Sequence, residues 1–133
     1  MKKLIILLFI LLIPVLALAQ TAEDYYDRGV IKFEQGDYSG ALKDFNKLIE
    51  LNPNNAIAYY SRGVAKGKLG DYRGAIQDYN KAIELNPNHA STYVNRGLSK
   101  IGLGQKDSGC LDLSKAGEMG SLLAYLNIKQ FCQ

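Results

Sequence analysis

The sequence predicts an all-α protein in which three helix-turn-helix units and a C-terminal capping helix stack into an α-solenoid. A block of thirty-four residues recurs: residues 22–55 match residues 56–89 at roughly 21 of 34 positions, and residues 90–120 form a more divergent third copy. The turn Gly36-Asp37-Tyr38 returns as Gly70-Asp71-Tyr72, and the end Leu51-Asn52-Pro53-Asn54 returns as Leu85-Asn86-Pro87-Asn88. Repetition at this period is typical of stacked units that share one continuous core. We therefore expect residues 20–120 to form a single repeat domain.

The first nineteen residues have the pattern of a secretory signal peptide. Lys2-Lys3 precede an apolar stretch from Leu4 to Ile13, and Ala17-Leu18-Ala19 supplies the small residues that predict cleavage between Ala19 and Gln20. The alternative is a retained membrane anchor, but about 16 mostly apolar residues broken by Pro14 fall short of the roughly 20 that span a bilayer. We expect a cleaved, periplasmic or secreted protein without a stable membrane span, and the sequence does not separate these two locations.

The chain without this signal is nearly neutral. The full sequence has 16 Lys and Arg against 13 Asp and Glu, and loss of Lys2 and Lys3 leaves 14 against 13, a net charge of +1. Nucleic-acid binding needs clustered cationic side chains to neutralise phosphates. We therefore expect no nucleic-acid partner.

Each unit is predicted to contain two helices, because its apolar and small residues fall at helical spacing in two stretches. A glycine suits the left-handed residue that ends the first helix, and the aspartate after it is placed to cap the second. Proline ends the second helix because it offers no N–H and disfavours the α conformation of the residue before it. In the first unit the stretches are marked by Tyr25, Gly29 and Phe33 and by Ala41, Phe45, Leu48 and Ile49; the turns are at Gly36-Asp37 and Gly70-Asp71, and the prolines are Pro53 and Pro87.

The third unit, residues 90–120, departs from this pattern most in its second helix. Gln105-Lys106 replaces Asp-Tyr, Gly109 replaces the packing Ala, and Met119-Gly120 stands where Asn-Pro is expected. Terminal repeats are expected to be atypical because one side of them has no neighbour. The following residues, 121–133, are predicted to form a capping helix whose inward stripe is Leu122, Tyr125, Ile128 and Cys132.

Over residues 22–120 these features resemble the tetratricopeptide repeat, a thirty-four-residue helix-turn-helix unit with preferred residues at fixed positions. The family places a bulky residue and a small residue in the first helix, and Ala, an aromatic residue and a closing Pro around the second. Leu48 departs from the pattern, since the family prefers Ala there. The matching residues are Tyr25, Tyr59 and Tyr93; Gly29, Gly63 and Gly97; Ala41, Phe45 and Pro53; and Ala75, Tyr79, Ala82 and Pro87.

The resemblance implies a right-handed superhelix whose first helices line a concave groove for an extended or helical peptide. The corresponding face here is more apolar than a solvated face, so a hydrophobic peptide or partner helix is the implied ligand. The alternative is that these side chains pack against the neighbouring unit. The family's chaperone-binding version clamps a terminal carboxylate with Lys and Asn, and Tyr26, Val30, Val64, Val94 and Leu98 occupy those positions here, so this clamp is not expected. The candidate groove residues are Tyr26, Asp27, Val30, Phe33, Glu34, Tyr60, Ser61, Val64, Lys68, Val94, Asn95, Leu98 and Ile101.

A charge pattern accompanies the repeat. An Arg precedes each repeated glycine, and an Asp follows each Arg after sixteen residues, which gives Arg28/Asp44, Arg62/Asp78 and Arg96/Asp112. An arginine at the seam between helices would need a carboxylate to offset its desolvation, so one hypothesis is a set of Arg/Asp pairs. The other is a solvated stripe of charges.

The two cysteines, Cys110 and Cys132, lie near the C-terminus of a chain that we expect to be exported. An even count in an oxidising compartment favours one disulfide, which would close a loop of about 22 residues and contribute roughly 3 kcal/mol. Two buried free thiols are the alternative.

The sequence offers little for catalysis or for a cofactor. Its one histidine, His89, follows a turn, and two cysteines with one histidine lack the short spacings of a zinc site. Gly104 and Gly109 have the spacing of a phosphate-binding loop, but Cys110-Leu111 stands where Lys and Ser or Thr are required. We therefore expect no enzyme activity, no metal and no cofactor.

Taken together, the patterns predict a protein-binding module of the cell envelope, an adaptor or assembly factor that holds a protein or peptide partner. The alternative is a structural subunit that self-associates as a homo-oligomer through an uncapped end or through the groove.

Overall fold

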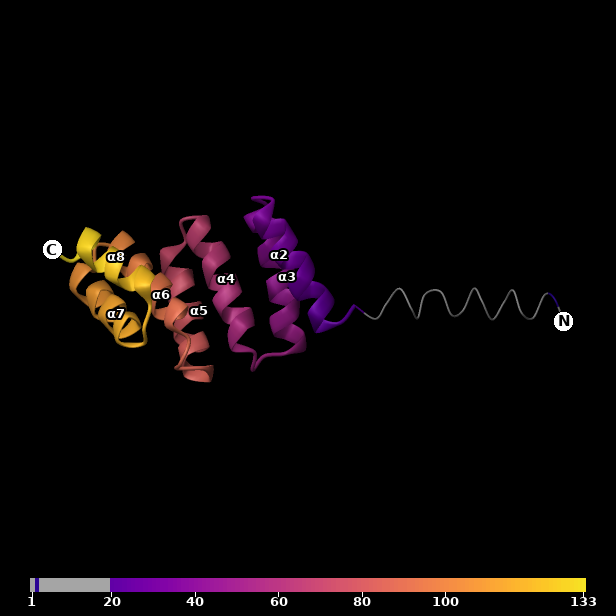
Figure 1. Cartoon of the computed structure of the whole chain (residues 1–133). Coiled ribbons are helices and arrows are strands. Elements are labelled where there is room, and N and C mark those ends of the chain that lie inside the picture. Colours follow the sequence, from indigo (N-terminus) through magenta and orange to yellow (C-terminus); the bar gives the residue numbers. More distant parts are fainter. Residues whose placement is uncertain (1, 3–19) are drawn as a thin grey trace.

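The computed structural model describes Lys2 and residues 20–133, and its helices stack in chain order as three pairs followed by a single helix (Figure 1). Extensive contacts join consecutive helices, as expected for a solenoid. This arrangement confirms the predicted all-α superhelix of helical pairs with a capping helix. The pairs are α2 (Ala22–Glu34) with α3 (Tyr38–Leu51), α4 (Ala56–Lys68) with α5 (Tyr72–Leu85), and α6 (Ala90–Gly102) with α7 (Lys106–Glu118), and the last helix is α8 (Leu122–Phe131).

Except for Lys2, the expected signal segment of residues 1–19 lies outside the described residues. In the part of the chain that is described, every helix falls short of the length and hydrophobicity that a bilayer crossing requires.

The turns form as their residue types predict. Gly36 and Gly70 both have φ of 81°, the left-handed conformation that a residue with a Cβ rarely adopts. The Asp37 carboxylate accepts a hydrogen bond from the Gly40 N–H at 2.8 Å, and Asp71 does the same for Gly74 at 2.9 Å. Each turn therefore ends one helix and caps the next within three residues.

The paired helices approach closely because a glycine of the first helix faces the second helix. A Cβ added at Gly29 would lie 2.6 Å from Cε1 of Phe45, and one at Gly63 would lie 2.7 Å from Cε1 of Tyr79. In the third pair the contact is between backbones, since a Cβ at Gly97 would lie 2.7 Å from the carbonyl oxygen of Gly109. The Gly109 that seemed a loss of pattern in the sequence is thus what allows α6 and α7 to touch.

The capping helix α8 packs on α7 and on the end of α6, with Ile128 and Cys132 of the predicted stripe against the core but with Leu122 and Tyr125 turned outward. Ala124 and Asn127 are buried, whereas Leu122 and Tyr125 are 73% and 57% exposed. The prediction of an inward stripe through Leu122 and Tyr125 was wrong, because the small Ala124 lets α8 lie closer to Leu113 and Ala116 of α7.

A disulfide joins Cys110 of α7 to Cys132 at the end of α8, which confirms the favoured pairing over two free thiols. It encloses most of α7, the connecting loop and the whole of α8. The bond therefore holds the final helix, which has a neighbour on one side only, against the stack.

Candidate peptide-binding groove

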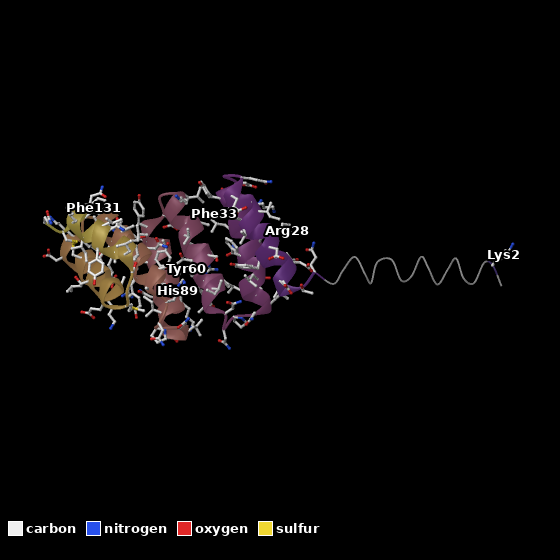
Figure 2. All side chains as sticks on the ribbon, viewed as in Figure 1. Lys2, Arg28, Phe33, Tyr60, His89 and Phe131 are labelled. Carbon is white, nitrogen blue, oxygen red and sulfur yellow. A yellow bond between two sulfur atoms is a disulfide. The ribbon has the colours of Figure 1, made fainter. Side chains whose placement is uncertain are left out.

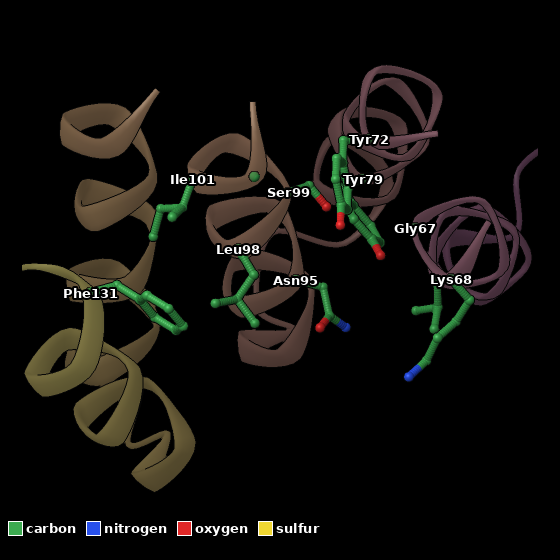
Figure 3. A pocket seen from close by; sticks show the side chains of 11 residues that line it. Gly67, Lys68, Tyr72, Tyr79, Asn95, Leu98, Ser99, Ile101 and Phe131 are labelled. Carbon is green, nitrogen blue, oxygen red and sulfur yellow. The ribbon is translucent and has the colours of Figure 1, made fainter. Parts of the chain in front are cut away.

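The first helices α2, α4 and α6 lie side by side and form two hollows on one face of the stack. The α2/α4 hollow has a volume of about 310 Å³, and the α4/α6 hollow has a volume of about 350 Å³. Val64 lines both, so the two hollows adjoin at this residue of α4. Figure 3 shows the second of them, with Leu98 and Asn95 from α6, Lys68 from α4, and Phe131 of α8 directed toward Leu98.

Most of the predicted groove residues meet in these two hollows. The α2/α4 hollow is lined by Val30, Phe33, Glu34, Tyr60, Ser61 and Val64, and the α4/α6 hollow by Val64, Lys68, Asn95, Leu98 and Ile101. Tyr26 lies apart, in a third hollow with Leu48 and Ile57, and Asp27 is exposed and lines none of the three.

Val94 is a predicted groove residue that lies outside the groove because it is buried. It is only 1% exposed and belongs to a core cluster with Leu113 and Ala124. The equivalent residues of the earlier units, Tyr26 and Tyr60, remain partly exposed. The difference arises because α8 covers the third unit, so a ligand cannot reach Val94 without moving that helix.

Several lining residues were missed by the sequence analysis. Tyr79 of α5, Ser99 of α6 and Phe131 of α8 all line the α4/α6 hollow. Tyr79 was assigned to the seam between helices, where its ring does pack, but its hydroxyl end extends to within 3.9 Å of the Cβ position of Gly67. Burial raises the pKa of the Tyr79 phenol. The available signal in the sequence was that Tyr79 stands where the first unit has Phe45. The additional hydroxyl of Tyr79 has to extend beyond the packed ring.

Tyr60, in the wall of the α2/α4 hollow, is held by three neighbouring side chains, of which His89 is labelled beside it in Figure 2. Its ring centre lies 6.2 Å from that of Tyr79 and 4.8 Å from that of His89, which meets it edge to face. Its hydroxyl accepts a hydrogen bond from Nδ2 of Asn95 at 3.1 Å. Burial raises the pKa of Tyr60, so the phenol stays neutral and presents an apolar ring edge to the groove.

The two hollows carry opposite charges at their rims. Glu34 lines the α2/α4 hollow, Lys68 lines the α4/α6 hollow, and both side chains are exposed. The remaining walls are mostly aliphatic or aromatic. The groove therefore offers apolar contact along its length and a change of charge from one end to the other.

The Arg/Asp pairing hypothesis is confirmed in all three units. Asp44, Asp78 and Asp112 are 2%, 3% and 6% exposed, and each accepts hydrogen bonds from the arginine sixteen residues earlier. Hydrogen bonding from Arg28, against the opposing effect of burial, lowers the pKa of Asp44. The three carboxylates are thus paired within the stack.

Each buried aspartate also forms an ion pair with a lysine that the sequence analysis did not single out. Nζ of Lys32, Lys66 and Lys100 lies 2.9, 2.9 and 2.8 Å from the corresponding carboxylate. Each lysine stands four residues after the arginine, the spacing that places two side chains on one helix face. That spacing was the signal that could have identified them.

Two of the arginines also link successive units. Arg62 donates a hydrogen bond from Nη1 to Oδ1 of Asn46 at 3.0 Å, and Arg96 does so to Asn80 at 2.8 Å. Because each asparagine belongs to the second helix of the preceding unit, these bonds fix one unit against the next.

The described residues contain no group of three or more His, Cys, Asp or Glu side chains placed to hold a metal ion. His89 donates to or accepts from Thr92 through Nδ1 at 2.7 Å and packs on Tyr60. It thus supports the wall of the groove at the junction of the second and third units.

Two family models match the chain. One, described as a TPR repeat, matches residues 29–70, and the other, described as a tetratricopeptide repeat, matches residues 56–89. None of the curated protein sequences compared with the chain matches it significantly.

Solved structures match over most of the stack. The TPR2B domain of yeast Sti1, in a complex with pHsp70, is 31% identical, covers 74% of this chain and 78% of its own, and superposes with a TM-score of 0.72. MamA is also 31% identical, with coverage of 75% and 58% and a TM-score of 0.72. The first TPR of Spaghetti (RPAP3), bound to the HSP90 peptide SRMEEVD, reaches a TM-score of 0.82 at 24% identity, with coverage of 86% and 93%. At that identity the likeness to Spaghetti supports the fold alone.

Proposed function

The chain belongs to the tetratricopeptide-repeat family, and from that premise we propose that it is a non-catalytic module whose groove holds a hydrophobic peptide or a partner helix. We also propose that it acts in the cell envelope as an adaptor or assembly factor. The observation that carries the binding proposal is the pair of apolar hollows that meet at Val64.

The shape of the groove favours a ligand with two bulky apolar side chains, one for each hollow. A helix supplies such anchors at three- or four-residue spacing, and an extended peptide supplies them at alternate positions. Glu34 and Lys68 set the direction of the ligand, with a basic residue toward the first and an acidic residue toward the second. A contact of this size gives an affinity on the order of micromolar. The yeast Sti1 domain was solved in a complex with pHsp70, which supports a protein ligand here.

The binding proposal is tested with peptides selected from a random display library against residues 20–133. Their affinity is then measured for the wild type and for Val64→Glu, which places a charge where the two hollows meet. We expect binding to weaken at least tenfold, since the charge would have to be desolvated by the ligand.

The matched control is Ile31→Glu, which introduces the same acid at a side chain that is 53% exposed and lines neither hollow. Circular dichroism verifies that both variants keep their helix content. Selected peptides that bind Val64→Glu as tightly as the wild type would reject the groove assignment.

The envelope location is supported by the composition of residues 1–19 and by the Cys110–Cys132 disulfide, since such bonds persist in oxidising compartments. The test is the intact mass of the protein recovered from producing cells. We expect a chain that begins at Gln20, has no alkylatable thiol, and is recovered from the envelope or the medium. A full-length cytoplasmic protein with both thiols free would contradict the proposal.

A further inference from the structure

The outer face of α8 carries the densest exposed apolar patch among the described residues. Terminal repeats of solenoids normally present a polar outer face, because an apolar one promotes association. In α8 four large apolar side chains fall within five residues, each more than half exposed. They are Leu122, Leu123, Tyr125 and Leu126, with exposed fractions of 73%, 56%, 57% and 60%.

The register of α8 matches that of the first helices of the preceding units. Tyr125 follows Tyr93 by 32 residues, and its hydroxyl donates to the carbonyl of Gly117 as that of Tyr93 donates to the carbonyl of Pro87. Ala124, fully buried, likewise follows Thr92, which is 1% exposed. At this register Tyr125 and Leu126 correspond to Tyr93 and Val94 of α6, which pack in a core cluster with Leu113 of α7, whereas Leu123 corresponds to the exposed Ser91.

A helix packed as in the preceding pairs does not fit on this face. The glycine of each first helix, Gly97 in the third unit, corresponds to Lys129 in α8. A Cβ alone at Gly97 would come within 2.7 Å of the facing backbone, and a lysine side chain is larger still. The occupant of this face must therefore lie farther away and at a different angle from α3, α5 and α7.

The opposite end of the stack does not fit the face either. One position of the first helices is buried in α4, α6 and α8, where it is Ala58, Thr92 and Ala124. In α2 the same position is Asp24, whose carboxylate is exposed and accepts a hydrogen bond from the Thr21 N–H. Glu23 and Asp27 are exposed beside it. Head-to-tail stacking of two copies would press the leucines of α8 against these carboxylates without cations to offset their desolvation.

We propose that α8 pairs with α8 of a second copy of this chain, in an antiparallel two-fold arrangement centred between Leu123 and Leu126. The patch amounts to roughly 450 Å² per copy, within the range of surface patches that act as binding sites. Two such patches together fall below the roughly 1,200 Å² at which specific interfaces begin, so the flanking polar side chains must supply the remainder. An isologous contact of this kind closes at two copies.

The charges at the edge of the patch are complementary in this arrangement. Antiparallel pairing about that centre brings Lys129 of one copy to the turn before α8 of the other. The Glu118 side chain at that turn is 73% exposed, and its contact with Lys115 is long, at 3.8 Å. Each interface therefore contains two Lys129–Glu118 pairs at its rim, which set the register of the helices.

The proposal is tested by sedimentation equilibrium of the purified protein with residues 20–133, from about 1 µM to 1 mM, the range over which interfaces of minimal size assemble. We expect the mass to rise from one chain to two and to stop there. Leu123→Glu/Leu126→Glu should remain a monomer throughout. The control Leu51→Glu/Leu69→Glu changes two leucines of similar exposure, 54% and 48%, outside the patch and should dimerise as the wild type does.

Three outcomes would overturn the proposal: a wild type that stays monomeric across this range, a dimer that survives Leu123→Glu/Leu126→Glu, or a mass that grows beyond two chains. The register is tested separately by charge reversal. Glu118→Lys and Lys129→Glu should each weaken the dimer severalfold, and the doubly reversed protein should recover it. Failure of the double variant to recover would refute the antiparallel arrangement.

Discussion

Asp44 in the first unit and Asp112 in the third form the same ion pairs, with an Arg and a Lys of the first helix, but in different surroundings. The side chains of Arg28 and Lys32 are 42% and 32% exposed, whereas those of Arg96 and Lys100 are 18% and 17% exposed. The third cluster lies between neighbours on both sides, and the first lies at the open end of the stack. The repeated sequence determines which charged side chains pair. Burial by the neighbouring units determines how strongly the stability of the fold depends on each pair.

The helix contact differs between the same two units. In the first, Gly29 faces the ring of Phe45, which can rotate or shift. In the third, Gly97 faces the backbone of Gly109, which cannot move without displacing α7. The third unit is thus the more tightly constrained of the two, although its sequence is the more divergent.

The largest expected effect is the loss of the third buried carboxylate. Asp112→Ala should reduce the free energy of unfolding by about 4 kcal/mol, because two shielded cations lose their partner. Asp44→Ala should cost about 1 kcal/mol, since water can solvate Arg28 and Lys32. Urea unfolding of both variants measures the difference. Equal losses would show that burial by the neighbouring units does not control these clusters.

Removal of the disulfide should have the second largest effect on the free energy of unfolding. Cys132→Ser is expected to cost about 3 kcal/mol, the chain-entropy estimate for a loop of this length. Hydrogen exchange should accelerate in α8 and remain unchanged in α2, because the bond holds only the last helix. A reducing agent should lower the melting temperature of the wild type and leave that of the variant unaltered.

Substitution of the glycines at the helix contacts should also destabilise the third unit more than the first, but by a smaller difference in the free energy of unfolding. Gly97→Ala is expected to cost about 2 kcal/mol through overpacking against backbone. At Gly29→Ala the ring of Phe45 can yield, and the higher helix propensity of alanine offsets part of the strain, which leaves a cost of about 1 kcal/mol. Thermal unfolding followed by circular dichroism compares the two. A larger loss at Gly29 would contradict the contrast between ring and backbone.

The smallest effect should be the acid dependence of the first unit. Hydrogen bonding from Arg28 lowers the pKa of Asp44 below its ordinary value of 3.8. Its contribution to stability is therefore complete above that value and is lost as the pH falls through the lowered pKa. Melting temperatures between pH 5 and pH 2 should fall less steeply for Asp44→Ala than for the wild type, and an identical slope in both proteins would contradict this assignment.

The parts of the fold that depend on one unit could be predicted from sequence. Gly36 and Gly70 identified the turns, and the sixteen-residue spacing from Arg28 to Asp44 identified a pair across the helical hairpin. These features follow from helix geometry and recur with the repeat.

The parts that depend on the last helix could not be predicted. The spacing into α8 is 32 residues rather than 34, so the position of Val94 gave no sign that Ala124 would cover it. The sequence analysis considered only the stripe that contains Leu122 and Tyr125, whereas the small Ala124 is the residue that packs on α7. Phe131 reaches the α4/α6 hollow only because α8 folds back over α6.

The hydrogen bonds from Arg62 to Asn46 and from Arg96 to Asn80 have a consequence for partner choice. Opening or tightening the curve of the stack would stretch both bonds together, so the separation of the two hollows is set before any ligand arrives. The ligand that we propose for both hollows would therefore need its two bulky side chains at that interval. On this proposal, the spacing of the apolar anchors limits the choice of partner before their chemical identity does.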